Sequence, residues 1–215
     1  SRVDGRVKQI TDRARIGNIY VNRNQIGAVV GVQPFGGEGL SGTGPKAGGP
    51  HFLHRLTVPA AADAPPTGAA VEGVRASVDL AARASALRAL QDAWDRRRDR
   101  LRLLAKAAAS CPSPARRIAE QVLVEAAPWC GDALTPPGPS GESNRLSLHG
   151  RGLWLCLGLD AESVLRQAIT ALATGNMVLA VRTEAIDALL SGLPCGDSFT
   201  WNGELDDVLS LPDLA

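Results

Sequence analysis

The stretch that decides the fold is residues 17–50, which read GNIYVNRNQIGAVVGVQPFGGEGLSGTGPKAGGP. It opens with an alternating run from Asn18 to Asn22, and this alternation predicts a short strand with Ile19 and Val21 on one face. Nine glycines follow in the same stretch: Gly27, Gly31, Gly36, Gly37, Gly39, Gly42, Gly44, Gly48 and Gly49. Glycine has no Cβ atom, so it allows unusual backbone dihedral angles and close approach to a ligand. The sequence therefore predicts a loop shaped for contact.

Gly27 and Ala28 are candidates for an anion-binding turn. Adjacent backbone N–H groups can hold a carboxylate when no bulky side chain obstructs them, and a glycine followed by an alanine leaves this approach open. In the alternative interpretation, Gly27 and Ala28 form an ordinary turn and Phe35 is a core residue.

The segments GNIYVN, IGAVVG and QPFGGEGLSGTGPKAGGP, taken in order, resemble the end of an aldehyde dehydrogenase catalytic domain. The resemblance is to the glutamate-semialdehyde (pyrroline-5-carboxylate) dehydrogenase branch found in the proline utilization A family. It implies that the loop after the strand is the aldehyde anchor. Two successive N–H groups, at Gly27 and Ala28, would hold the α-carboxylate of L-glutamate γ-semialdehyde, and Phe35 would cover its aliphatic part.

Residues 37–42, GEGLSG, fit the GxGxxG pattern but are not expected to bind a dinucleotide. That fingerprint must follow a strand and open a helix, whereas here Pro34 precedes it and a Gly-Pro pair at 44–45 follows. Lys46 does not follow a glycine directly and is not followed by Ser or Thr, so the phosphate-loop pattern fails as well.

The composition indicates a globular chain with no nucleic-acid partner and no transmembrane segment. The 215 residues, 45% of them hydrophobic, can form one large or two small domains. A net charge of +1 gives no electrostatic reason to expect nucleic acid. No apolar run reaches the roughly eighteen residues of a membrane span. The N-terminus is not typical of a signal peptide or a natural start, so a longer parent chain is expected.

The cysteines and histidines do not indicate a metal site. Four cysteines are irregularly spaced and form no CxxC pair, which fits reduced thiols in the cytoplasm: Cys111, Cys130, Cys156 and Cys195. His51 and His54 lie three residues apart but have no third ligand nearby, so no metal is expected there.

Changes in composition divide the chain into residues 1–57, a linker at 58–75 and a second domain at 76–215. The first part is expected to begin with a helix that ends at Gly17 and carries apolar residues at helical spacing: Val3, Val7, Ile10 and Ala14. It is expected to close with a short apolar segment at Phe52, Leu53 and Leu56. The linker is rich in Ala and Pro and poor in large apolar residues.

The second domain is predicted to be helical at first and then β-α-β. One apolar stripe in the helical region 76–110 is expected to face the core: Leu87, Leu90, Trp94, Leu101, Leu104 and Ala108. The basic run 96–98 is expected to be a solvated face paired with Asp92, Asp95 and Asp99. After a short helix at 114–127, we expect strands at 146–148 and 153–157, then a helix capped by Asp160, then a strand at 178–181 in parallel pairing.

The second domain resembles the opening of an aldehyde dehydrogenase cofactor-binding domain, and is similar to the C-terminal domain of longer proline utilization A proteins. The resembling segments are residues 141–144, 151–152 and 171–179. The family's Pro-Trp-Asn loop is replaced by residues 157–160, and its ribose-binding lysine and proline by Val181-Arg182. The resemblance therefore implies an α/β fold: the end of an aldehyde dehydrogenase catalytic domain, followed by a degenerate Rossmann-type domain that binds no cofactor.

The family implies a bifunctional enzyme that oxidises L-glutamate γ-semialdehyde to glutamate with NAD, downstream of an FAD-containing proline dehydrogenase domain. Its nucleophile and base lie upstream of the anchor loop, so no residue of this chain is expected to be catalytic and the chain alone is expected to be inactive. The upstream domains and further copies of the enzyme are the implied partners. Two alternatives stay open: an isolated nucleotide-binding module, and a purely structural or oligomerisation module.

Overall fold

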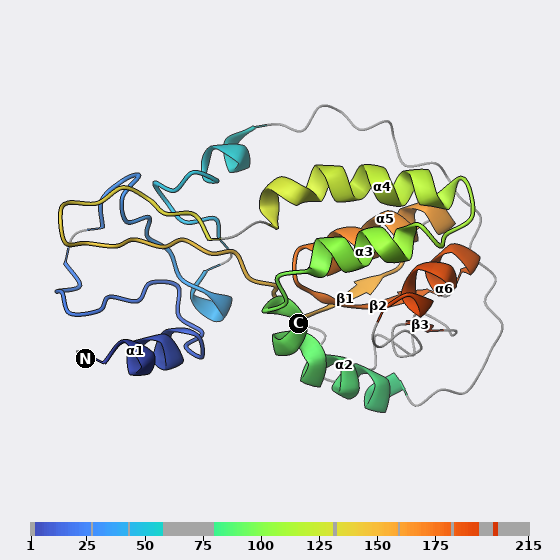
Figure 1. The fold of residues 1–215 in the computed structure, drawn as a ribbon, viewed down its shortest axis with the longest axis horizontal. Helices are drawn as coiled ribbons and strands as arrows, with labels where there is room; N and C mark the ends of the chain where they lie inside the picture. Colours follow the sequence, from blue (N-terminus) through green and yellow to red (C-terminus); the bar gives the residue numbers. More distant parts are fainter. Residues whose placement is uncertain are drawn as a thin grey trace. The chain divides into compact units, whose positions relative to one another are not determined.

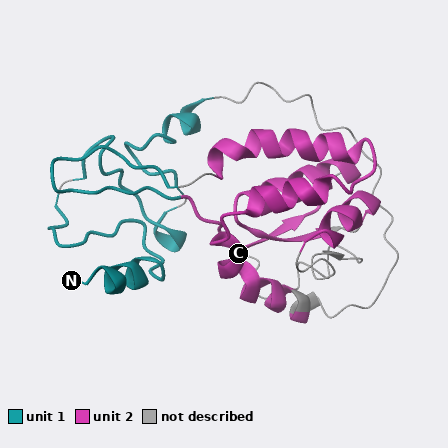
Figure 2. Cartoon of the chain, viewed as in Figure 1, with its two compact units in different colours: residues 1–63, 133–147 teal, residues 64–132, 148–215 magenta. Residues whose placement is uncertain are grey.

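The computed structural model describes residues 3–26, 28–42, 44–57, 80–130, 133–158, 160–181, 183–193 and 200–201. The chain divides into two compact units, unit 1 with residues 1–63 and 133–147, and unit 2 with residues 64–132 and 148–215 (Figure 2). Segment 133–147 thus groups with unit 1, although the sequence places it within the second domain. The bounds 1–57, 58–75 and 76–215 stay a prediction, and the linker lies outside the described residues.

Unit 1 contains little regular secondary structure. Its helical elements are α1 at Asp4–Thr11 and two 3₁₀ turns, η1 at Gly39–Ser41 and η2 at Leu53–Leu56 (Figure 1). Two isolated antiparallel bridges join its extended segments, one between Phe35 and Ala47 and one between Leu134 and Leu146. Among the described residues of this unit, only Gln33 and Pro34 are buried.

Two predictions for unit 1 are wrong. The run Asn18 to Asn22 is not a strand, because no described segment pairs with it and a strand needs a neighbour for its N–H and C=O groups. Helix α1 ends at Thr11, well before Gly17. A Cβ atom on Gly17 would lie 2.0 Å from the carbonyl oxygen of Gly36, so this glycine permits a close backbone approach. The predicted closing segment at 52–56 is solvent-exposed.

Unit 2 contains a parallel sheet of three strands in the order β1-β2-β3. The strands are β1 at Leu153–Cys156, β2 at Met177–Val181 and β3 at Thr200–Trp201. Helix α5, at Ala161–Ala173, connects β1 to β2, which pair in parallel from Leu153 with Met177 to Cys156 with Ala180. The predicted parallel β-α-β unit is therefore confirmed, and unit 2 has the predicted α/β class.

The other helices of unit 2 are α2 at Leu80–Asp95, α3 at Arg100–Ala108, α4 at Ala115–Ala126, the 3₁₀ turn η3 at Ala127–Trp129, and α6 at Glu184–Ser191. Helices α2 and α5 both pack against β1 and β2, while α4 packs on α5 and α3 (Figure 1). The β2 side chains from Met177 to Ala180 are at most 1% exposed. Because successive strand side chains point to opposite faces, both faces of β2 are covered.

The predicted apolar stripe of the helical region is confirmed. Leu87, Trp94, Leu104 and Ala108 are buried, and Leu90 and Leu101 pack against the same core. The region forms two helices, however, with residues 96–99 between α2 and α3. No helix in the described part of the chain is long and apolar enough to cross a membrane.

The predicted charge pairing of the basic run is correct for two of its three aspartates. Asp92 pairs with Arg96, and Asp99 pairs with Arg97 and Arg102. The prediction is wrong for Asp95, whose side chain is 3% exposed and pairs with His149.

Candidate substrate-anchor loop

The two described anchor residues, Ala28 and Phe35, flank a hydrogen-bonded turn at residues 29–33. Gly27 lies outside the described residues, while Ala28 is described and exposed. The carbonyl of Val29 accepts the N–H groups of Val32 at 3.1 Å and Gln33 at 2.7 Å. Phe35 follows the turn and is 58% exposed, so its side chain is not part of a core within the described chain. The structure therefore places Ala28 and Phe35 at the two ends of a short loop, both open to a partner.

The backbone around Phe35 is held on both sides. The N–H of Phe35 donates to the carbonyl of Ala47 at 3.1 Å, and the N–H of Ala47 donates back at 2.9 Å. The amide of Asn18 joins the flanking peptide groups, since its Nδ2 donates to the carbonyl of Pro34 at 2.9 Å and its Oδ1 accepts the N–H of Gly36 at 3.1 Å. One side chain thus fixes the residues before and after Phe35.

Lys46 completes this arrangement. Its ammonium donates to the carbonyl of Gly17, to the carbonyl of Gly36 at 2.8 Å and to Asn18 Oδ1 at 3.1 Å. Burial lowers the pKa of Lys46, and the nearby carboxylate of Glu38 partly offsets this effect. In the sequence, Lys46 stood out only as a candidate phosphate-loop lysine. A lone lysine inside a glycine-rich stretch was the available signal for a structural role.

A second polar cluster supports the same loop. The carboxylate of Glu142 accepts hydrogen bonds from Arg23 Nη1 and Gln33 Nε2, and the guanidinium carbon of Arg23 lies 5.6 Å from the centre of the Tyr20 ring. The Tyr20 hydroxyl and Gln33 Oε1 are buried and have no hydrogen-bond partner among the described residues. Sequence reasoning missed this cluster, because Glu142 lies 109 positions from Gln33.

The GxGxxG pattern at 37–42 forms the 3₁₀ turn η1 and opens no α-helix, as predicted. A Cβ atom on Gly37 would lie 2.3 Å from the carbonyl oxygen of Ser41. Internal packing therefore accounts for this glycine without a bound phosphate.

The N-terminus of α5 in unit 2 is filled by groups of the protein itself. Asp160 Oδ1 accepts the N–H of Ser163 at 2.7 Å, which confirms the predicted cap, and this hydrogen bonding lowers the pKa of Asp160. A Cβ atom on Gly158 would lie 2.4 Å from the backbone nitrogen of Val164, so the preceding loop lies close against the helix. A pyrophosphate at this position would meet a carboxylate, so these residues do not fit the NAD pyrophosphate.

The described cysteines are poor nucleophiles. Cys111 and Cys156 are buried and Cys130 is half-buried. Burial raises the pKa of each thiol, that of Cys156 to about 12, whereas nucleophilic catalysis needs a thiolate. Cys195 lies outside the described residues, and within the described ranges no group of His, Cys, Asp and Glu could hold a metal ion.

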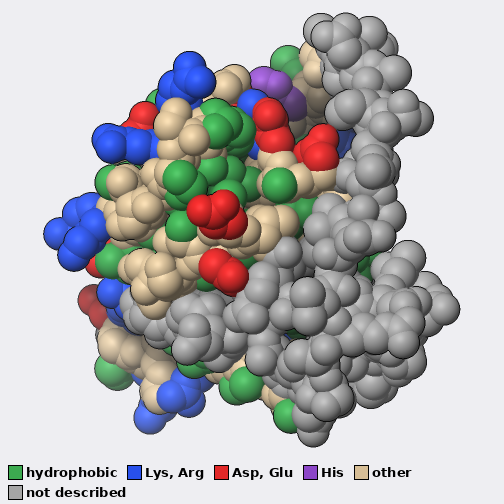
Figure 3. Space-filling model, turned by 90° about the vertical axis from the view of Figure 1, so that its right-hand side faces the viewer, with side chains coloured by type: hydrophobic (Ala, Val, Ile, Leu, Met, Phe, Trp, Pro, Cys, Tyr) green, Lys and Arg blue, Asp and Glu red, His purple; other side chains and the backbone are tan. Residues whose placement is uncertain are grey.

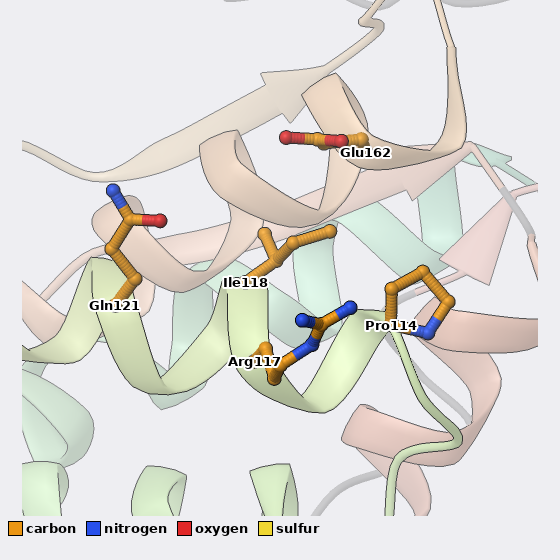
Figure 4. Close-up of a pocket in the computed structure, with 5 residues that line it drawn as sticks. All are labelled: Pro114, Arg117, Ile118, Gln121 and Glu162. Carbon is orange, nitrogen blue, oxygen red and sulfur yellow. The ribbon is translucent and has the colours of Figure 1, made fainter.

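In the described part of unit 2, one open hollow of about 430 Å³ lies between α4 and the start of α5 (Figure 4). Its lining consists of surface side chains: Pro114, Arg117, Ile118, Gln121 and Glu162. On the face shown in Figure 3, acidic side chains lie among hydrophobic ones and basic side chains gather toward one edge. Neither feature resembles the loop of unit 1, where half-buried polar side chains hold the backbone on both sides of an exposed phenylalanine.

Comparison with known proteins first gives the class: residues 1–62 match the model of the aldehyde dehydrogenase family. The particular relatives follow. Over 200 residues, 90% of the chain, the sequence is 39% identical to the bifunctional protein PutA of Escherichia coli (strain K12), and the chain spans 14% of that relative's length. A stretch of 47 residues, 22% of the chain, is 53% identical to mitochondrial delta-1-pyrroline-5-carboxylate dehydrogenase of Mus musculus and covers 8% of it.

A solved structure of proline utilization A with proline bound in remote sites aligns with a TM-score of 0.49 and 23% identity, over 60% of this chain and 17% of that chain. The sequence comparisons carry the conclusion. The chain is a homologue of PutA over most of its length, so the predicted resemblance to the aldehyde dehydrogenase and proline utilization A families is confirmed.

Proposed function

We propose that this chain is the terminal part of an NAD-dependent L-glutamate γ-semialdehyde (1-pyrroline-5-carboxylate) dehydrogenase of proline catabolism, and that it supplies the anchor for the substrate's carboxylate. The single observation that carries the proposal is that residues 1–62 match the aldehyde dehydrogenase family. Among the described residues of unit 1, only Gln33 and Pro34 are buried, so this unit has almost no apolar core of its own. The names of the relatives, PutA and delta-1-pyrroline-5-carboxylate dehydrogenase, support the choice of substrate.

Unit 1 has the surface expected of one part of a larger domain. Many of its large apolar side chains are exposed, among them Val3, Ile10, Ile16, Ile26, Val30, Leu40, Leu53 and Leu56. Apolar side chains that are exposed in an isolated unit are often covered by further protein. The buried Tyr20 hydroxyl and Gln33 Oε1 also fit a surface that further chain completes, because an unpaired buried polar atom costs roughly 1–3 kcal/mol. The proposed partners are upstream dehydrogenase domains of the same polypeptide.

The proposed role of the loop is to bind and orient the substrate. The N–H groups of Gly27 and Ala28 would hold the α-carboxylate, and Phe35 would exclude water from the aliphatic part of the molecule. The reaction also needs a cysteine thiolate, a base-activated water and NAD, which accepts the hydride. We assign the thiolate to the upstream domains, because burial raises the pKa of each described thiol. The resemblance to the proline utilization A family supports the same assignment for the base, NAD and the FAD of the proline dehydrogenase reaction.

For unit 2, we propose a structural role as a degenerate aldehyde-dehydrogenase-like domain that packs against the dehydrogenase and steadies its homo-oligomeric assembly. The capped N-terminus of α5 supports this role over nucleotide binding. Trp154, on the strand β1, is 49% exposed and offers apolar surface for such packing.

The test compares the purified 215-residue chain with a polypeptide in which it is joined to the upstream domains. NADH formation from glutamate semialdehyde is expected in the longer polypeptide and not in the chain. Activity of the chain that disappears when all four cysteines are changed to serine would assign the reaction to this chain and overturn the proposal.

A further inference from the structure

We infer that Asn18 and Lys46 are positioning residues that fix the place of Phe35, and that they thereby set the affinity for a semialdehyde carrying an α-carboxylate. The part that concerns substrate rests on the proposed function. The part that concerns the place of Phe35 rests on the hydrogen bonds alone. Neither side chain is assigned a contact with substrate.

The first step is that the peptide groups around Phe35 have defined partners. Asn18 Nδ2 donates to the carbonyl before Phe35, and Asn18 Oδ1 accepts the N–H after it. The backbone of Phe35 itself pairs with Ala47, the residue that follows Lys46. Asn18 is therefore hydrogen-bonded to both segments of this bridge. In one segment it binds the backbone of Pro34 and Gly36, and in the other it binds the side chain of Lys46.

The second step is that Lys46 connects three segments at one point. Its ammonium binds the carbonyl of Gly17 in the entering segment, the side chain of Asn18, and the carbonyl of Gly36 directly after Phe35. A lysine ammonium has three donors and no acceptor, so these three oxygens use its full capacity. The Lys46 side chain is thus occupied by the protein and is not available to a carboxylate.

The third step is that the ammonium lies where the backbone at Gly17 and the backbone at Gly36 approach closely. A side chain on Gly17 is excluded, because its Cβ atom would lie 2.0 Å from the carbonyl oxygen of Gly36. The backbone at Gly17 can therefore lie close to the backbone at Gly36. The Lys46 ammonium donates to the carbonyl groups of both residues. Removing the ammonium would leave two carbonyl groups without their charged donor, and hydrogen bonds to charged groups are the stronger ones.

The test uses Lys46→Met and Asn18→Leu, which keep side-chain size but remove the polar groups. The chain has three phenylalanines, so selective ¹⁵N-phenylalanine labelling gives a spectrum in which the Phe35 amide can be followed. We expect both variants to speed deuterium exchange of the Phe35 amide by at least about tenfold, because its bridge to Ala47 opens more often. The Phe52 amide, bound to Gly49, serves as the internal reference, and Lys106→Met in unit 2 as the control variant.

Equal exchange of Phe35 in wild type and both variants, or an unprotected Phe35 amide in the wild type, would overturn the inference. In the longer, active polypeptide the same variants are expected to raise KM for glutamate semialdehyde about tenfold with little change in kcat, the pattern of lost binding rather than lost chemistry. Faster exchange with an unchanged KM would support the positioning of Phe35 and instead refute its proposed contact with substrate. The two failures are thus distinguishable.

Discussion

Asp95 Oδ2 lies 2.8 Å from His149 Nδ1, although the two residues are 54 positions apart. Asp95 Oδ1 accepts the N–H of Gly150, also at 2.8 Å. The carboxylate therefore joins the end of α2 to the segment that leads into β1. Burial alone would raise the pKa of Asp95, but hydrogen bonds from His149 and Gly150 and the charges of His149 and Arg100 hold it below its ordinary value.

This pair predicts how the stability of unit 2 depends on pH. The pKa of Asp95 in the folded chain is below the unfolded value of about 3.9, so the ionised carboxylate stabilises the fold above about pH 4, and this contribution is lost as pH falls through the folded pKa. We expect His149→Ala to raise the pKa of Asp95 and to move the midpoint of acid unfolding, followed by circular dichroism, to higher pH.

Asp95→Ala should also lower the free energy of unfolding at pH 7 by about 1–3 kcal/mol, because the N–H of Gly150 loses its partner. Asp92→Asn is the matched control, since Asp92 is exposed and its pair with Arg96 is long at 3.7 Å. Urea midpoints that are equal for Asp95→Ala and the control would show that the buried pair does not stabilise the unit.

The burial of Cys156 predicts a slow reaction with alkylating reagents. Its side chain is 2% exposed and its pKa is raised to about 12, so almost no thiolate forms near pH 8. In the native chain we expect iodoacetamide to modify the half-buried Cys130 before Cys156, and urea to make both react at similar rates. Mass spectrometry of the digested chain gives both rates. Rapid native alkylation of Cys156 would contradict the packing of β1 described above.

The parts of unit 2 that the sequence predicted are those with local signals. The cap at Asp160, the short apolar runs of β1 and β2 and the stripe around Leu87 each depend on neighbours within a few positions. Asp95 was mispredicted for the opposite reason. It has the spacing of a surface ion pair, but its partners, His149 and Gly150, lie far along the chain.

The parts of unit 1 that the sequence did not predict are those that depend on contacts outside the local pattern. Ile19 and Val21 alternate as in a strand, yet no described segment pairs with them. Gly17 reads as a helix cap but serves a close approach to Gly36. For the anchor, the pattern predicts Gly27, Ala28 and Phe35, and this assignment stays a prediction. Lys46 could be recognised as a support of this loop only once its three acceptors were visible.

The anchor loop predicts changes in substrate affinity in the longer, active polypeptide. Gly27→Val should block access to the adjacent N–H groups, and Phe35→Ala should remove an apolar wall worth roughly 1–3 kcal/mol. Both should raise KM for glutamate semialdehyde, by about tenfold or more for Phe35→Ala. Phe52→Ala is the control in the same unit, because Phe52 lies outside the loop. A KM that is unchanged in either anchor variant would remove that residue from the site.

The N-terminus of α5 predicts that unit 2 does not bind NAD. A pyrophosphate binds where a helix offers free N–H groups and positive partial charge, and here the Asp160 carboxylate already accepts the N–H of Ser163. The loop before it is held as well, since the N–H of Gly158 donates to Gln167 Oε1 at 3.1 Å. Calorimetric titration of the chain with NAD is therefore expected to give no heat.

Asp160→Ala separates the capping role from ligand exclusion. The substitution should lower the urea midpoint of unit 2, because the N–H of Ser163 loses its hydrogen-bond acceptor. It should still give no NAD binding, because the hydrogen bond between Gly158 and Gln167 and the close packing of Gly158 on α5 remain. Glu162→Ala is the matched control. Glu162 lies in the same turn, but its side chain forms a surface ion pair with Arg166. Micromolar NAD binding by the wild-type chain would contradict the structural role and favour a nucleotide-binding one. Binding that appeared only in Asp160→Ala would mean that the carboxylate, rather than the packed loop, excludes the cofactor.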